Sequence, residues 1–214
     1  EAWRKYRLEL AYQAEGKDAF LPLLLALAGL GNESLRKRLT DPSDGAVLDE
    51  SIGYFAASMR HRPASSGQIA RVLTEYFGQP VEVEQFIGCW YEVPAAQQTI
   101  LGGANSTLGK DALAGVRVWQ RDLRLRLSVG PLGRSGFDAF LPGGRAARAL
   151  RSLLSMFSGV TLEYEVLLVL RGVDVQGVCL AGEREGGRLG WDSYLVAGPQ
   201  AHDRNDVRYE LHAL

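Results

Sequence analysis

The sequence predicts an α+β fold: an N-terminal helical part followed by two duplicated helix-plus-antiparallel-strand units with small, mainly antiparallel sheets. Three observations support this prediction. Apolar residues recur with the helical period in residues 48–59 and again in 69–76. After Gly78 the period changes to two, and residues 81–84 and 123–127 alternate apolar and charged side chains, as half-buried strands do. The helix and the strands then recur further along the chain.

Length and composition exclude several classes of protein. The chain has 214 residues, of which 46% are hydrophobic, so it can form one large domain or two small ones. Its formal net charge of −1 gives no overall basic field that would attract nucleic acid or acidic membranes. The longest apolar run, Phe20–Leu30, has about half of the ~20 residues that a membrane span requires. Disorder, fibrous repeats and membrane spans are therefore excluded.

The cysteines indicate neither a disulfide framework nor a zinc site. Cys89 and Cys179 have no Cys or His at short spacing beside them, so we expect no metal and no cofactor. So few cysteines fit a reducing compartment. The chain begins at Glu1 inside a helical pattern without a signal-peptide pattern, and we expect it to be a piece of a longer polypeptide.

Residues 1–45 are predicted to form the helical part, which ends at a turn cluster around Pro42. Trp3, Tyr6 and Leu10 share one helical stripe, and a second helix follows Pro22. Its run from residue 23 to 28 is apolar on nearly every side, so it must be buried among several neighbours or against another subunit. Burial within the chain is the favoured interpretation.

An internal duplication divides the remaining chain into residues 46–128 and 129–214. A shift of 81 residues superposes three segments without a gap: the helical positions Ile69, Val72, Leu73, Tyr76 and Gly78 on Leu150, Leu153, Leu154, Phe157 and Gly159, the strand 81–84 on 162–165, and the Leu-Gly-x-Asp segment 108–111 on 189–192. With three further residues, the closing strand 123–127 falls on 207–211.

The loops between these shared segments, 94–107 and 172–188, differ between the two units. In repeated units the shared part is usually scaffold and the differing part carries the contacts. Trp and Tyr dominate buried interface energies, so the candidate partner-interface residues are Trp90, Tyr91, Pro94, Trp191 and Tyr194. The alternative for Trp90 and Trp191 is that they are core aromatics of their units.

Charged residues alternate along the predicted strands. Glu82 and Glu84, like Glu163 and Glu165, could be proposed as catalytic carboxylate pairs. If the strands share a sheet, however, these carboxylates can pair with the arginines of strand 123–127 at ~0.2 to 1 kcal/mol each. Cross-strand pairing explains the pattern without catalysis.

Several short motifs together resemble the TssG family, also called ImpH or VasB, over about Leu48 to Leu195. They are Gly130-Pro131-Leu132, Phe137-Asp138-Ala139-Phe140-Leu141-Pro142-Gly143-Gly144, Leu189-Gly190-Trp191-Asp192-Ser193-Tyr194-Leu195, Phe86-Ile87-Gly88-Cys89-Trp90 and Leu101-Gly102-Gly103. TssG-like proteins are baseplate subunits of the bacterial type VI secretion system. Their chains have a further N-terminal region, which we expect to precede Glu1 in the full polypeptide.

The resemblance implies a structural adaptor and not an enzyme. It implies a cytoplasmic baseplate wedge, docked near the inner membrane, in which the chain joins a pair of TssF subunits to TssK trimers for assembly of the contractile sheath and tube. No catalytic residues follow from it. The duplication gives an independent reason for such a role, because two similar units present two similar docking surfaces that can seat two copies of one partner.

Two other function classes stay open. The segment 66–73 with the preceding helix loosely resembles a helix-turn-helix, although Glu82 and Glu84 follow where phosphate contacts would be needed. An enzyme would have to use an isolated residue such as His61 or Cys89. Gly143-Gly144 before a predicted helix could cradle a phosphate but is better explained as a tight turn, since the sequence has no Walker or Rossmann pattern.

Overall fold

A computed structural model describes residues 20–41, 45–61, 63–159, 161–178, 188–196 and 198–212 of the chain, and the fold is α+β as predicted. The helices are α2 (Leu21–Leu27), α3 (Asp49–Tyr54), α4 (Ala56–Arg60), α5 (Ser66–Phe77), α6 (Arg134–Phe140) and α7 (Arg145–Ser158). The strands are β1 (Val81–Glu84), β2 (Cys89–Glu92), β3 (Arg117–Gln120), β4 (Arg124–Leu132), β5 (Glu163–Leu170) and β6 (Arg204–His212). Short 3₁₀ turns are η1 (Glu33–Leu35), η2 (Arg38–Thr40), η4 (Ala95–Gln97) and η5 (Gly172–Asp174).

Four of the strands form one mixed sheet in the order β1-β4-β5-β6. Strand β1 is antiparallel to β4, and β5 is antiparallel to β6, but the central strands β4 and β5 are parallel. Helices α6 and α7 lie between β4 and β5 in the chain, and parallel neighbours require such a crossover. The structure therefore differs from the predicted small sheets, because the two predicted units share a single sheet.

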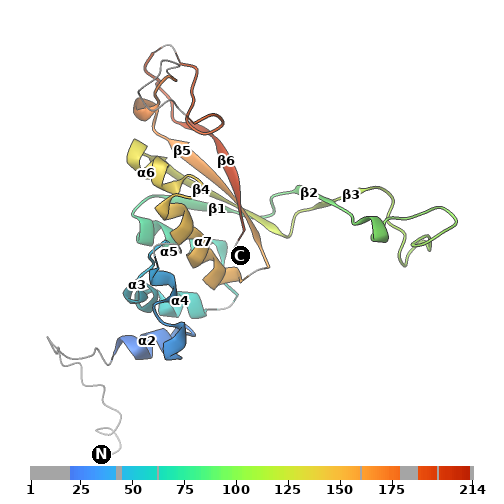
Figure 1. The fold of residues 1–214 in the computed structure, drawn as a ribbon, viewed down its shortest axis with the longest axis horizontal. Coiled ribbons are helices and arrows are strands. Elements are labelled where there is room, and N and C mark those ends of the chain that lie inside the picture. Colours follow the sequence, from blue (N-terminus) through green and yellow to red (C-terminus); the bar gives the residue numbers. More distant parts are fainter. Residues whose placement is uncertain are drawn as a thin grey trace, which may run out of the picture.

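The core lies between one face of this sheet and the helices α5 and α7 (Figure 1). Each helix contributes its apolar stripe, Ile69, Val72 and Leu73 in α5 and Leu150, Leu153 and Leu154 in α7. The chain turns out of α5 at Gly78, whose φ of +63° favours glycine, and enters β1 directly. The buried strand residues alternate, as the period of two predicts: Val81, Leu127, Val129, Tyr164, Val166, Leu168, Val207 and Leu211.

The opposite face of the sheet carries the charged residues of the strands. Arg126 joins Glu84 of β1 to Glu165 of β5, with N–O distances of 3.1 and 2.8 Å. Arg124 joins Glu163 and Glu210 at 3.0 and 2.8 Å. The predicted cross-strand pairing is thus confirmed for Glu84, Glu163 and Glu165.

The elements that the duplication predicts are present at the predicted spacing. Helix α5 leads into β1, and 81 residues later α7 leads into β5. The predicted boundary between residues 128 and 129 falls inside β4, which pairs with β1 on one side and β5 on the other. The division of the chain into units 1–45, 46–128 and 129–214 stays a prediction.

The N-terminal part is less buried than predicted. Helix α2 begins next to Pro22, as expected, but only Leu25 of its apolar run is fully buried, whereas Leu23 and Leu27 are about half exposed. The prediction that the apolar run is buried within the chain is therefore wrong for Leu23 and Leu27. Residues 1–19, including the stripe of Trp3, lie outside the described residues.

The predicted helix over 48–59 is two short helices, α3 and α4, separated at Phe55. Phe55 has φ −91° and ψ 9°, outside the helical region, and its side chain is buried in the core. Within the described residues, no helix has the length and apolar character needed to cross a membrane.

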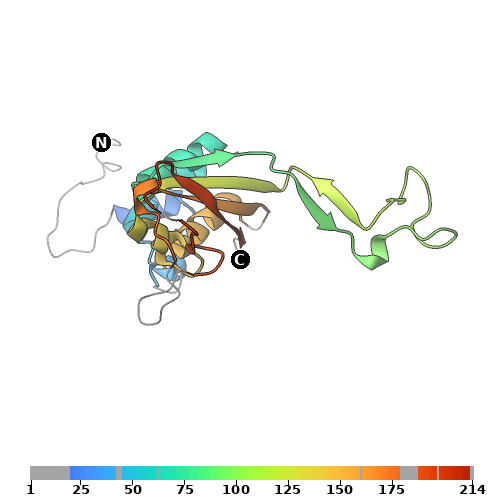
Figure 2. The same ribbon diagram turned by 90° about the horizontal axis from the view of Figure 1, so that it is seen from above.

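Strands β2 and β3 form a separate antiparallel ribbon between β1 and β4 in the chain. Figures 1 and 2 show that this ribbon projects away from the sheet and carries a long loop, residues 93–116, at its far end. We call the ribbon and its loop the arm (residues 89–120). The sequence did not predict these strands.

Candidate docking surfaces

The loop of the arm is ordered by polar groups within it. The Asn105 side chain donates to the carbonyls of Ala96 and Gln98 at 2.9 and 3.2 Å. Thr99 and Leu113 exchange two hydrogen bonds of 3.0 and 2.8 Å across the loop. Apart from Val93, its large apolar side chains are exposed instead, and Leu101 is 98% exposed. A loop that satisfies its own polar groups and exposes apolar ones is typical of a docking surface.

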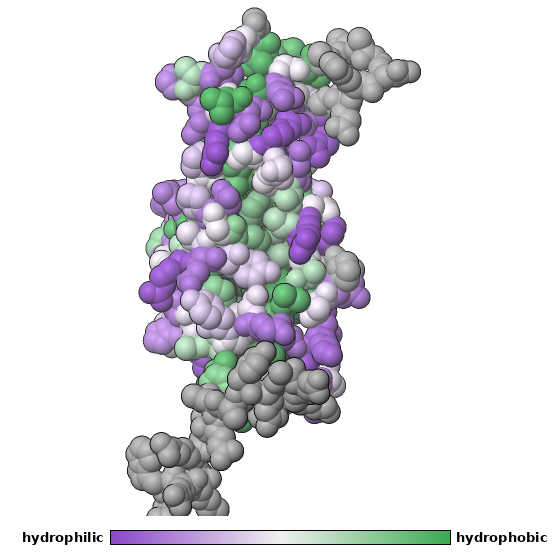
Figure 3. Space-filling model, turned by 90° about the vertical axis from the view of Figure 1, so that its left-hand side faces the viewer, coloured by the Kyte–Doolittle hydropathy of each residue, from purple (hydrophilic) through white to green (hydrophobic). Residues whose placement is uncertain are grey.

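A second loop, residues 171–203, joins β5 to β6 and is described over 171–178, 188–196 and 198–203. Its base is closed where the Gly172 amide donates to Asp203 at 2.9 Å, and its two sides meet again where the Val178 amide donates to the Tyr194 carbonyl at 3.0 Å. Val173, Leu189 and Leu195 are exposed on it. Figure 3 shows hydrophobic residues at this end of the molecule, at the top of the view. Below them, hydrophilic and hydrophobic residues are interspersed on the surface.

Both loops contain a Leu-Gly-x-Asp turn of the same geometry. Gly109 has φ +79° and Gly190 has φ +81°, values that favour glycine. In each turn the aspartate carboxylate accepts the amide of the residue four positions earlier, Thr107 or Arg188. The leucines that precede the glycines are 93% and 92% exposed. The chain therefore presents one apolar turn twice.

The base of the arm is fastened to the sheet by Tyr91. Its hydroxyl donates to Glu163 Oε2 at 2.6 Å, and Arg124 donates to the same oxygen at 3.0 Å. Burial and this hydrogen bond raise the pKa of Tyr91 to about 12. Burial opposes ionisation of Glu163, but the hydrogen bonds from Tyr91 and Arg124 outweigh it, so its pKa lies below the ordinary value. The carboxylate is thus charged at neutral pH and accepts both donors.

Replacing Tyr91 by Phe is expected to lower the free energy of unfolding by about 1 to 2 kcal/mol, since a hydrogen bond to a partly exposed charged group is lost. The loss should vanish in a Glu163→Ala background, which denaturant unfolding of the four variants of a double-mutant cycle would measure. Tyr54→Phe is the matched control, because Tyr54 donates to Glu75 at 2.7 Å on an exposed surface. This variant should change the free energy of unfolding little. If Tyr91→Phe lowered the free energy of unfolding equally with Glu163 and with Ala at position 163, the hydrogen bond to Glu163 would not be what fastens the arm.

The second turn is held against α6 by four charged side chains. The side chain of Asp192 is 2% exposed and accepts from Arg134 of α6 and, at 2.8 Å, from Arg188. Arg188 also pairs with Asp138 of α6, and Arg134 lies 3.5 Å from Asp138. Burial opposes ionisation of Asp192, but the hydrogen bonds and charge of Arg188, with the charge of Arg134, lower its pKa. We call these four residues the α6 clamp.

Comparison with protein families supplies the decisive observation. A family model described as type VI secretion, TssG, matches residues 1–196. The chain belongs to the TssG family.

Solved structures have the same fold. A chain of a type VI secretion TssK-TssF-TssG baseplate subcomplex, determined by cryo-electron microscopy, is similar with a TM-score of 0.70 and 18% identity over 97% of this chain and 86% of that one. A chain of a type VI secretion baseplate complex is similar with a TM-score of 0.58 and 19% identity over 97% of this chain and 58% of that one. No curated protein sequence matches.

The five candidate interface residues of this TssG-family chain have different environments. Trp90 and Pro94 are exposed on the arm, and Trp90 packs edge-to-face on Trp119 with ring centroids 5.3 Å apart. Tyr91 anchors the arm. Trp191 is partly buried with its ring 6.0 Å from that of Tyr209, and Tyr194 is buried. Their role at an interface stays a prediction.

Sequence reasoning did not single out four leucines that the TssG-family structure leaves almost fully exposed: Leu101, Leu108, Leu189 and Leu195. For Leu108 and Leu189, the repeated Leu-Gly-x-Asp segment was the available signal. A leucine beside a glycine and an aspartate in a turn has few neighbours that could bury it.

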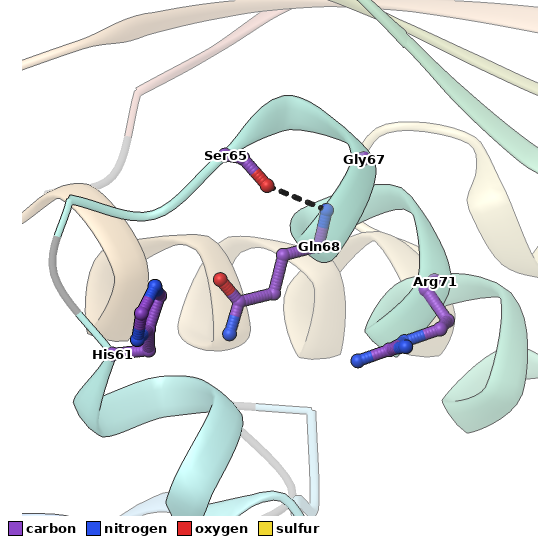
Figure 4. A pocket seen from close by; sticks show the side chains of 5 residues that line it. All are labelled: His61, Ser65, Gly67, Gln68 and Arg71. Carbon is purple, nitrogen blue, oxygen red and sulfur yellow. Dashed lines mark hydrogen bonds between the residues drawn. The ribbon is translucent and has the colours of Figure 1, made fainter.

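The start of α5, where the helix-turn-helix alternative would place its reading helix, carries an open pocket lined by His61, Ser65, Gly67, Gln68 and Arg71 (Figure 4). Ser65 caps the helix by accepting the Gln68 amide at 3.2 Å, and the Gln68 side chain donates to Ser58 at 2.8 Å. Both polar groups are thus used within the fold. Glu82 and Glu84 follow in β1, and their negative charge disfavours phosphate binding.

The other site candidates of the TssG-family chain are not brought together. His61 lines the α5 pocket, whereas Cys89 begins β2 of the arm. Gly143 has φ +81° and Gly144 caps α7, as a tight turn predicts, and Arg148 donates to the Gly143 carbonyl. Over the described ranges, no group of three or more His, Cys, Asp or Glu residues could hold a metal ion.

Proposed function

We propose that the chain is a structural subunit of a type VI secretion baseplate that seats two copies of one partner through its two Leu-Gly-x-Asp turns. Family membership and the fold of chains from baseplate complexes support the baseplate role. The observation that carries the mechanism is the repeated turn, with the same backbone and the same exposed leucine in two places. Two similar surfaces on one chain can seat two copies of one partner.

The partners are proposed to be TssK at the two turns and TssF elsewhere on the chain, because the similar structure is that of a TssK-TssF-TssG subcomplex. Helix α2 offers a separate surface for TssF, because Phe20, Leu23 and Leu27 form an exposed apolar stripe. The site of action is cytoplasmic, at a baseplate near the inner membrane. The role is geometric, since one chain carries both turns, the first on the arm and the second against α6.

Co-expression with TssF and TssK of the same bacterium, followed by the mass of the purified complex, tests this function. The wild-type chain should retain two docked TssK assemblies. Leu108→Asp and Leu189→Asp should each remove one of them, and the double variant both, because an aspartate cannot be desolvated in an apolar pocket without a partner.

Leu27→Asp is the matched control, since it makes the same change on a half-exposed leucine of α2. It should leave both TssK assemblies in the complex. Full TssK retention by the double variant, with the chain still folded, would contradict docking at the turns. Loss of both assemblies in either single variant would contradict two independent docking sites.

A further inference from the structure

The two Leu-Gly-x-Asp turns share a backbone but differ in what holds them. Asp192 of the second turn is buried in the α6 clamp, whereas Asp111 of the first turn is exposed. Within the described part of the chain, Asp111 accepts the Thr107 amide at 2.8 Å and forms no ion pair. A buried carboxylate needs charged or hydrogen-bonding partners, and only the second turn supplies them from another element.

The predicted duplication indicates which residues make this difference. The shift of 81 residues places Arg134, Asp138 and Arg188 on Gly53, Ala57 and Thr107. None of these three can form an ion pair. The positions that correspond to the charged partners of Asp192 are therefore uncharged in the predicted first unit.

The element that carries the first turn is also less stable than the one that holds the second. The first turn lies at the end of the two-stranded β2–β3 ribbon, and an isolated two-stranded ribbon is marginally stable. The second turn instead bonds directly to α6, whose Phe137 and Phe140 are buried in the core. The second turn is therefore held by α6, which packs on the core, and the first turn is held only by the arm.

We propose that the α6 clamp holds the second turn in its binding conformation, so that the second turn meets its partner as a rigid element and the first as a compliant one. Arg134, Asp138 and Arg188 are then positioning residues that act through Leu189. A preorganised loop binds more tightly because less conformational entropy is lost on association. This inference rests on the proposed function only for the identity of the partner.

Hydrogen exchange of the full chain tests the clamp without any partner. In the wild type, amides of residues 188–192 should exchange more slowly than those of 107–111. Arg134→Ala should speed exchange in 188–192 about tenfold, as expected for a local opening made easier, and leave 107–111 unchanged. Arg134→Lys should slow exchange in 188–192 again in part, because it keeps the positive charge. Asp138→Asn, which removes the charge of Asp138 from the α6 clamp, should speed exchange there less than Arg134→Ala does. Unchanged exchange in 188–192 for both Arg134→Ala and Asp138→Asn would overturn the proposal.

Binding to purified TssK tests the consequence. In a Leu108→Asp background, which leaves only the second turn, Arg134→Ala should weaken binding about tenfold, because the competent conformation becomes rarer. In a Leu189→Asp background the same change should have no effect. Equal weakening in both backgrounds would overturn the positioning role. If neither leucine change alters binding, the proposed function fails. The hydrogen-exchange measurement then still tests whether the α6 clamp holds the second turn.

Discussion

Leu73→Ala and Leu154→Ala are each expected to lower the free energy of unfolding by about 2 to 5 kcal/mol, the usual cost of a cavity in a close-packed core. Both leucines are fully buried, and they occupy equivalent positions of α5 and α7. Because the four strands share one sheet and one core, both variants should shift the same cooperative transition.

Denaturant unfolding followed by far-ultraviolet circular dichroism and by tryptophan fluorescence measures this effect. Leu101→Ala is the matched control, since Leu101 is almost fully exposed and its truncation should change stability by less than about 0.5 kcal/mol. Two separate transitions, each shifted by only one of the core variants, would mean that residues 46–128 and 129–214 fold as independent domains.

Much of the sheet could be predicted from the sequence because alternation is a local signal. Residues 81–84, 123–127, 162–165 and 207–211 all lie in or overlap strands of the sheet. Their arginines and glutamates were expected to pair if the strands shared a sheet, and Arg126 does pair with both Glu84 and Glu165. Local period was thus sufficient to place these strands in the sequence, although not to predict that they form a single sheet.

The arm could not be predicted because its strands lack the pattern of a half-buried sheet. Residues 89–92 and 117–120 are short, and their outward face carries Trp90 and Trp119, which hydropathy alone assigns to a core. The parallel pairing of β4 and β5 likewise depends on the α6–α7 crossover and not on either strand. The α6 clamp joins residues about fifty positions apart, a distance that no local pattern spans.

Replacing Gly45 by Ala is expected to lower the free energy of unfolding by about 2 to 4 kcal/mol, the sum of a left-handed backbone and an overpacked contact. Gly45 has φ +91°, and a Cβ there would lie 2.1 Å from the backbone nitrogen of Ala149 in α7. Backbone of a helix cannot move aside as a side chain can. Gly67→Ala is the control, because nothing lies within 4 Å of that Cβ in α5, and it should stabilise by about 0.5 to 1 kcal/mol.

The two glycine variants, compared by thermal unfolding, also decide how the N-terminal part relates to the rest. Gly45 is the last residue of the predicted helical part, yet its contact is with a helix about one hundred positions later. A large loss for Gly45→Ala would mean that residues 20–45 pack as one body with α7, so that the exposed stripe of α2 is held at a fixed position relative to both docking turns. A loss no greater than that of a surface change would mean that α2 is free to move, and the geometric role would then rest on the sheet and the α6 clamp alone.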